Sequence, residues 1–175
     1  MRRDPKTVIA ALAAAVVLCC AAACAAAQAY PSKPVRILTG FPPGGPTELI
    51  GRVLADHLTK AMGQPFYVEG KPGAAGNVAA ELLVNSAPDG YTLLVAGYGI
   101  LTVNHLLYRD MKIDTTKDFA PISILASFPL VLEVSTKLPV TSYREFLAYA
   151  KQHGGALNHG SPGIGTLPHL AEELF

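Results

Sequence analysis

The chain has 175 residues, a formal net charge of +1 and 50% hydrophobic residues, which is typical of a globular protein with room for one ordinary core. A charge near zero without a basic cluster excludes a nucleic-acid-binding surface, because such a surface needs several cations to neutralise phosphates. All three cysteines, Cys19, Cys20 and Cys24, lie near the start, so the rest of the chain has no disulfide framework and no thiolate or cysteine-ligated metal chemistry.

Residues 1–29 are typical of a secretory signal peptide. A positively charged start precedes an uncharged apolar run over 8–27, and residues 27–29 (Ala-Gln-Ala) have small side chains at the two positions that a signal peptidase reads. We therefore expect cleavage before Tyr30, export to the periplasm, and no stable membrane insertion afterwards.

Two other interpretations of this segment stay open. The apolar run is about long enough to span a bilayer as a retained anchor, although it is rich in alanine and only weakly apolar. Lipid attachment at Cys24 would need a large apolar residue three positions earlier, where Ala21 stands.

After the leader, short β-branched runs alternate with longer helical stretches, which predicts β-α-β units around a mostly parallel sheet. A proline at position 46 suits the first turn of a helix, and Ser142 with Glu145 forms a capping box. The predicted strands are 35–39, 66–69, 91–96, 119–126, 130–135 and 157–160. The predicted helices start near 46 and near 77 (ending about 86), cover 101–107 and 142–152, and start again after 166, with 110–118 as a surface loop.

Three segments share one arrangement, in which a strand is followed by a glycine-containing loop and the start of a helix. They are 41–48 (FPPGGPTE), 71–77 (KPGAAGN) and 160–166 (GSPGIGT). Free backbone N–H groups and the helix dipole make such places suitable for anions. Glycine can also serve only to let the chain turn tightly, but three such loops at the carboxyl ends of strands favour a ligand site.

Enzyme motifs are weak in this sequence. A serine hydrolase needs Gly-x-Ser-x-Gly, and Ser161 has His159 where the first glycine should be. A dinucleotide site needs Gly-x-Gly-x-x-Gly after the first strand, and the nearest match, at 97–99, has Thr102 at the third glycine. The histidines outside the leader form no pair at helical ligand spacing, so we expect no metal, no cofactor and no enzymatic activity.

Four blocks of the sequence, 30–58, 68–94, 118–126 and 157–175, resemble the periplasmic receptors of tripartite tricarboxylate transporters, also called Bug proteins. The resemblance implies an α/β fold of the periplasmic-binding-protein-like type II, a two-lobe clamshell that is present here as an incomplete N-terminal part. Residues 30–127 would form lobe 1, residues 128–175 would begin lobe 2, and the hinge would fall near 127–129.

The function that this resemblance implies is capture of a small carboxylate, such as a di- or tricarboxylate, an acidic amino acid or an aromatic acid. The receptor would pass it transiently to the membrane subunits of the transporter, and the full-length form would be a monomer. A ligand-sensing receptor for a signalling system and a non-functional truncated fragment are the alternatives.

The resemblance also implies which residues contact the ligand. Asn77 and His169 fall on family-typical positions, where we expect helix capping for the first and loop packing for the second. Pro46 and Glu48 depart from the usual pattern, because proline lacks an N–H and Glu48 lengthens a carboxylate that bears on ligand choice. The expected ligand-binding residues are Phe41, Pro43, Gly44, Gly45, Thr47, Glu48, Gly97, Tyr98, Gly99, Ser161, Gly163, Gly165 and Thr166.

Overall fold

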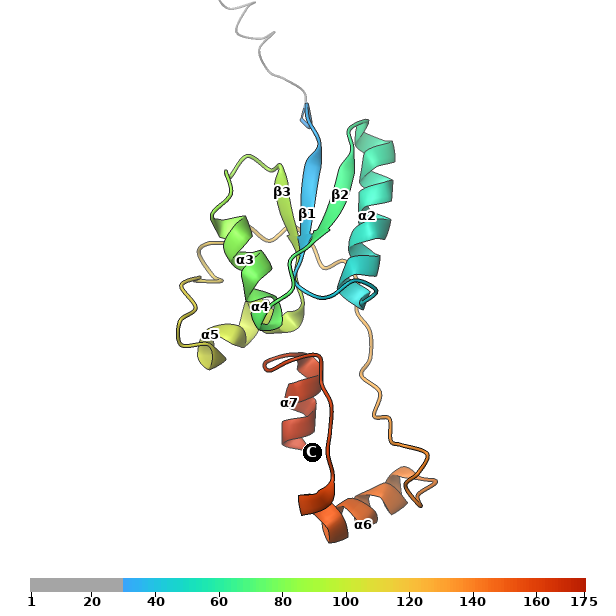
Figure 1. Cartoon of the computed structure of the whole chain (residues 1–175). Coiled ribbons are helices and arrows are strands. Elements are labelled where there is room, and N and C mark those ends of the chain that lie inside the picture. The colour runs from blue at the N-terminus through green and yellow to red at the C-terminus, as the bar shows by residue number, and fades with distance from the viewer. Residues whose placement is uncertain (1–29) are drawn as a thin grey trace, which may run out of the picture.

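The structure is a computed structural model that describes residues 30–175. The predicted signal peptide, its cleavage and the three cysteines lie outside these residues. Three strands form a parallel sheet in the order β2-β1-β3 (Figure 1). They are β1 (Val35–Thr39), β2 (Phe66–Gly70) and β3 (Thr92–Val95), which confirms the first three predicted strands.

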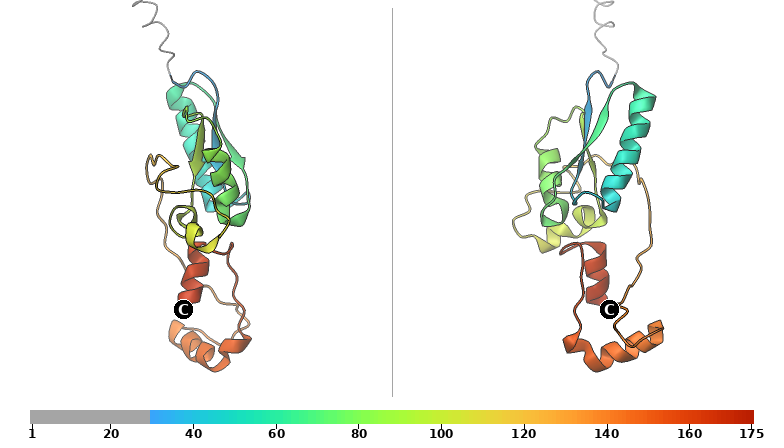
Figure 2. Two further views of the ribbon diagram at one scale, coloured as in Figure 1. Left: turned by 90° about the vertical axis from the view of Figure 1, so that its left-hand side faces the viewer. Right: turned by 45° about the vertical axis from the view of Figure 1, so that its right-hand side comes forward.

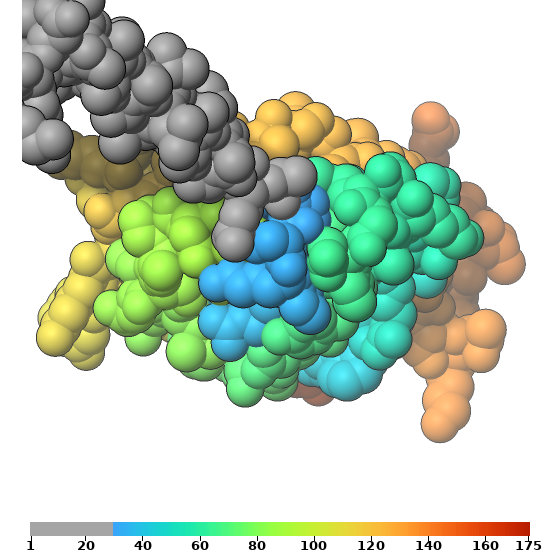
Figure 3. Space-filling model, turned by 90° about the horizontal axis from the view of Figure 1, so that it is seen from above, coloured from blue at the N-terminus to red at the C-terminus, as the bar shows by residue number. Residues whose placement is uncertain are grey.

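Helices cover both faces of the sheet, which explains why the central strand is almost completely buried. Val35 and Ile37 of β1 pack with the apolar face of α2 (Pro46–Met62), whereas Leu94 of β3 lies on the other face with Ala80 of α3 (Asn77–Val84). This alternation follows from the two-residue period of a strand. Seen from the amino ends of the strands, β1 lies between the residues of β2 and α2 and those of β3 and α3 (Figure 3).

Local signals set the ends of the longer helices. As predicted, α2 begins with proline at its first turn, after Gly45. The helix ends before Gly63, whose left-handed conformation lets its N–H donate to the Thr59 carbonyl. A short 3-10 turn (Ala74–Gly76) precedes α3. Farther along, α6 (Tyr143–His153) confirms the predicted capping box in part: the Glu145 N–H donates to the Ser142 hydroxyl, while the Glu145 carboxylate accepts from Thr141.

Between β3 and the loop at 110–118, the prediction of a glycine loop followed by a single helix is wrong. The helix starts earlier, as α4 (Tyr98–Thr102), and a separate turn follows as α5 (Asn104–Leu107). Val103 separates the two because its backbone, at φ −120° and ψ −35°, leaves the helical region. Gly97 therefore serves as the N-cap residue of α4, and Tyr98 and Gly99 belong to its first turn.

The predicted strands at 119–126, 130–135 and 157–160 are also wrong. A strand needs a hydrogen-bonding neighbour, and within residues 30–175 none of these segments pairs with another. Their side chains are mostly exposed, with Ile124 at 89% and Val131 at 75%. Figure 2 shows residues 119–135 as part of an extended connection that leads to α6.

The last elements lie beyond the carboxyl ends of the strands (Figures 1 and 2). A 3-10 turn (Gly154–Ala156) follows α6, and α7 (Leu167–Leu174) returns toward the sheet with its first residues. The final residue, Phe175, stacks on Phe146 of α6 at 5.6 Å between ring centres. Among residues 30–175, no helix combines the length and the apolar character needed to span a bilayer.

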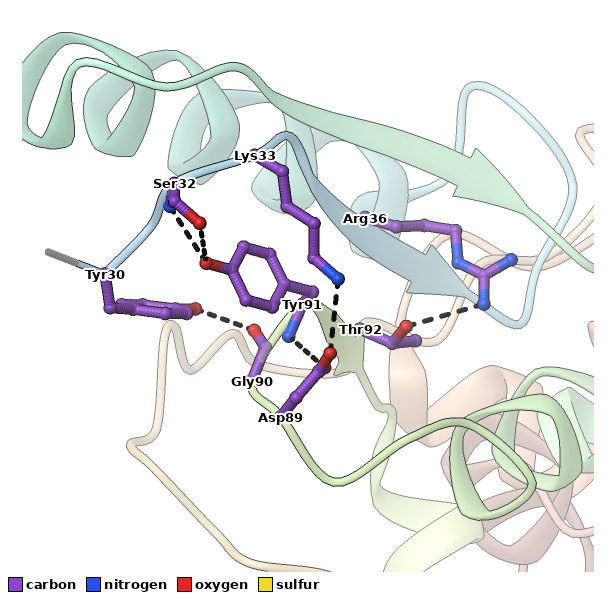
Figure 4. Close-up of polar contacts among 8 residues, drawn as sticks. All are labelled: Tyr30, Ser32, Lys33, Arg36, Asp89, Gly90, Tyr91 and Thr92. Carbon is purple, nitrogen blue, oxygen red and sulfur yellow. Dashed lines mark hydrogen bonds and ion pairs between the residues drawn. The ribbon is translucent and has the colours of Figure 1, made fainter. Parts of the chain in front are cut away.

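A polar cluster fastens the chain at the amino ends of the strands (Figure 4). The Tyr30 hydroxyl donates to the Gly90 carbonyl at 2.6 Å, and the Tyr91 hydroxyl accepts from the Ser32 N–H at 2.8 Å. The Lys33 ammonium lies 3.3 Å from the Asp89 carboxylate and 4.2 Å from the centre of the Tyr91 ring. The start of the described chain is therefore tied to the turn before β3.

This cluster predicts an acid-sensitive contribution to stability. The hydrogen bond from the Tyr91 N–H, together with the smaller effects of the Lys33 hydrogen bond and charge, lowers the pKa of Asp89 below its ordinary value of 3.8. A lowered pKa in the folded state contributes stability above the unfolded pKa, and the contribution is lost as the pH falls through the folded pKa. We expect Asp89→Asn to make the free energy of unfolding, measured by urea denaturation, less dependent on pH below about 4. Asp110→Asn, at an exposed position outside the cluster, is the control and should leave the slope unchanged.

Candidate functional site

The carboxyl ends of β1 and β3 bring two of the predicted loops together. The loop after β1 carries Phe41, whose ring lies close enough to Gly97 that a Cβ there would be 3.4 Å from it. Gly97 in turn begins α4 directly after β3. Because parallel strands all end at one edge of the sheet, this edge collects the starts of α2, α3 and α4.

The helices that begin at this edge lack side-chain caps. Gly45 before α2, Gly76 before α3, Gly97 before α4 and Thr166 before α7 make no side-chain cap, whereas α6, which lies apart, is capped by Ser142. The first N–H groups of a helix have no partner within it, so those without another acceptor can bind an anion, and the helix dipole favours negative charge there. At α3, the Asn77 N–H already donates to the Ala74 carbonyl. These uncapped helix starts are the main chemical feature of the site.

One amide of the first loop is already occupied. Gly44 donates its N–H to a carboxylate oxygen of Glu48, whose other oxygen accepts from the Arg52 guanidinium, at 2.8 Å from Nε. The hydrogen bond from the Gly44 N–H, and to a smaller extent that from Arg52, lowers the pKa of Glu48, so its carboxylate is ionised near neutral pH. In this structure Glu48 is buried over the loop and accepts the Gly44 N–H itself, so the expected contact of Gly44 with a ligand stays a prediction.

Thr47 has a buried hydroxyl oxygen without a hydrogen-bond partner among the described residues. A buried hydroxyl in this state is unfavourable unless something else completes its hydrogen bonding. Its position in the first turn of α2, next to the free amides, agrees with a role in binding. Pro43 lies on the exposed part of the same loop.

The loop before α7 lies directly against α4 and α5. A Cβ on Gly99 would come within 2.4 Å of the Gly165 carbonyl oxygen, and the Tyr108 hydroxyl donates to the Ile164 carbonyl at 3.0 Å. Gly97–Gly99 and Gly163–Thr166, which are far apart in sequence, are thus brought together, as Figure 1 shows for the loop that precedes α7.

The two hydroxyls expected from this loop are placed differently. Thr166 is buried, and its hydroxyl donates to the Gly163 carbonyl at 2.7 Å, so this hydroxyl proton is used in a hydrogen bond within the loop. Ser161 is exposed, as is Tyr98 at 54%. Gly163 holds a positive φ of 148°, which suits glycine and shapes the turn.

Asn77 does not cap α3, contrary to the prediction, because Gly76 occupies the N-cap position and Asn77 is the first helical residue. Its side-chain oxygen instead accepts from the Asn104 amide at 2.6 Å, in a buried pair that joins α3 to α5. His169 lies in α7 rather than in a loop, with Nε2 3.8 Å from Glu173.

Asn104 is the residue that sequence reasoning missed. It is fully buried, it also donates to the Ala75 carbonyl at 3.3 Å, and its own oxygen has no partner among the described residues. That oxygen would lie 2.8 Å from a Cβ on Gly165, so Asn104 faces the place where the two loops meet. An asparagine within the largely apolar segment 100–107 was the available signal, although Thr102 and His105 in the same segment are also polar.

The histidines form no common centre. His153 stacks on Tyr149, and His159 lies 3.1 Å from Glu172. Over residues 30–175, no three His, Cys, Asp or Glu side chains gather closely enough to hold a metal ion.

Comparison with known proteins identifies the relatives of this chain. Residues 50–175 match the family model described as "Tripartite tricarboxylate transporter family receptor". The chain belongs to this family. BugT of Bordetella pertussis is 35% identical over 150 residues, and a protein from the gbd 5' region of Cupriavidus necator is 40% identical over 148 residues. These two alignments cover 85% and 84% of this chain, but 46% and 44% of the relatives, so the chain spans about half their length.

Solved structures of similar proteins support the fold of this family receptor. A protein of R. palustris solved with adipate matches at a TM-score of 0.80 and 35% identity, over 83% of this chain and 48% of that one. MatC from Rhodopseudomonas palustris, with bound malate, matches at 0.66 and 30% identity, over 79% and 47%. The expected family and α/β fold are therefore confirmed, over about half the length of the periplasmic binding proteins. The family is one of binding proteins and not of enzymes, as predicted.

Proposed function

We propose that the family receptor captures a small carboxylate in the periplasm and delivers it to the membrane subunits of a tripartite tricarboxylate transporter. The observation that carries this proposal is the set of helix starts without side-chain caps at the carboxyl edge of the sheet. Relatives solved with adipate and with malate, both dicarboxylates, support the same class of ligand.

In this proposal, the groups that bind the ligand come from two lobes. Residues 30–127 form lobe 1, with the free amides at the start of α2 and the buried Thr47 hydroxyl, and 128–175 begin lobe 2, with the loop before α7. The signal peptide is cleaved before Tyr30, and the full-length receptor acts as a monomer. A ligand that contacts both lobes stabilises the closed form, because those contacts exist only when the lobes approach each other.

Binding is tested on the protein secreted into the periplasm from the full sequence. We expect adipate or malate to bind in calorimetry, and a concentration of 100 times Kd to raise the free energy of unfolding by about 2.7 kcal/mol. The control ligand is 1,6-hexanediol, which has the chain length of adipate without its charges and should give no heat and no stabilisation. Equal stabilisation by the diol, or chemical conversion of the acid, would contradict the proposal.

A further inference from the structure

Two glycines allow the loop before α7 to touch α4, as described for the site. Gly99 approaches the Gly165 carbonyl so closely that a Cβ would lie 2.4 Å from the oxygen, a distance that real Cβ atoms do not adopt. At Gly165, a Cβ would lie 2.8 Å from the Asn104 side-chain oxygen and 3.1 Å from Leu107, and φ is +87°. Any side chain at either position would separate the two segments.

A hydrogen bond fixes the same contact from the side. The Tyr108 hydroxyl, at the end of α5, donates to the Ile164 carbonyl across 56 positions of sequence. Asn104 is hydrogen-bonded to Ala75 and Asn77, so the surface that receives the loop is anchored to the 3-10 turn and to α3. The contact therefore joins a buried, hydrogen-bonded part of the proposed lobe 1 to the loop of the proposed lobe 2.

We propose that Gly99, Gly165 and Tyr108 form a docking contact that determines how closely the two lobes approach, and that Tyr108 is a positioning residue that raises ligand affinity without touching the ligand. Only the expected effect on ligand affinity rests on the proposed function. The geometric part stands on the approach of the two segments themselves. Closure that is stabilised by direct lobe contacts lowers the free energy that the ligand has to supply, and so tightens binding.

The distance between the lobes is the direct test. The chain has no cysteine after Cys24, so spin labels at Glu81→Cys on α3 and Lys151→Cys on α6, both exposed, report the separation specifically. We expect the protein that carries only these two labels to show a narrow distribution of label-to-label distances. The same labelled protein with Gly99→Ala should show a longer mean distance and a broader distribution. Gly154→Ala is the matched control, because a Cβ there meets nothing within 4 Å and its φ of −52° suits alanine.

Tyr108→Phe provides a second variant that keeps the ring and removes only the hydroxyl. We expect it to broaden the distance distribution and to weaken adipate binding by about threefold to tenfold, the effect of one hydrogen bond. An unchanged distribution in both Gly99→Ala and Tyr108→Phe would overturn the docking contact. Failure of every variant, and of the unchanged protein, to bind adipate or malate would instead overturn the proposed function, while the distances would still decide the docking contact.

Discussion

Replacing Asn104 with leucine is expected to lower the free energy of unfolding by about 2–5 kcal/mol, because it leaves one buried and one partly buried acceptor without a donor. The Asn104 amide supplies one hydrogen to the Asn77 oxygen at 2.6 Å and the other to the Ala75 carbonyl at 3.3 Å. Leucine has a similar volume and no donor. Urea denaturation of the two proteins measures the difference.

The double variant Asn77→Leu/Asn104→Leu separates lost hydrogen bonding from poor packing. Replacing both partners of a buried pair by apolar groups can be nearly neutral, so we expect the double variant to recover part of the loss, leaving mainly the unpaired Ala75 carbonyl. A single variant that loses less than about 0.5 kcal/mol would show that the pair contributes little to the fold.

The parts of the fold that could be predicted are those whose signals are local. The pattern of α2 contains its own start at Pro46 and its own end at Gly63, and the Ser142 cap of α6 lies next to the helix that it stabilises. Each of the three confirmed strands is a short run rich in β-branched, aromatic or leucine residues, and β2 and β3 pair in parallel with the two sides of β1. Such elements are specified by residues close in sequence.

What could not be predicted depends on distant partners. The run at 119–135 has strand-like composition, but a strand exists only where a second strand supplies its hydrogen bonds, and residues 30–175 supply none there. Likewise, Asn77 looks like a helix cap in sequence, yet its partner, Asn104, is 27 positions away. In the loop at 41–48, the glycines were evident from the sequence. The hydrogen bond from the Gly44 N–H to Glu48 was not, because it depends on how the turn folds.

Glu48→Gln is expected to strengthen the binding of a dicarboxylate by about fivefold to tenfold. The Glu48 carboxylate lies on the loop that offers amides to the ligand, so its negative charge opposes a second carboxylate nearby even though Arg52 partly balances it. Two like charges about 8 Å apart repel by about 1 kcal/mol or more at the intermediate dielectric of a protein surface. Glutamine keeps an oxygen for the Gly44 N–H while removing the charge, so the loop conformation is retained.

The measurement is calorimetric titration of adipate into the unchanged protein, into Glu48→Gln and into the control Glu81→Gln, which alters an exposed glutamate on α3. The control should bind as the unchanged protein does. The difference in adipate affinity between Glu48→Gln and the unchanged protein should shrink at high salt, because screening weakens a charge effect but leaves a change in loop shape intact. If Glu48→Gln binds adipate more weakly at all salt concentrations, Glu48 acts through the shape of the loop, and its carboxylate orders the amides for the ligand instead of repelling it.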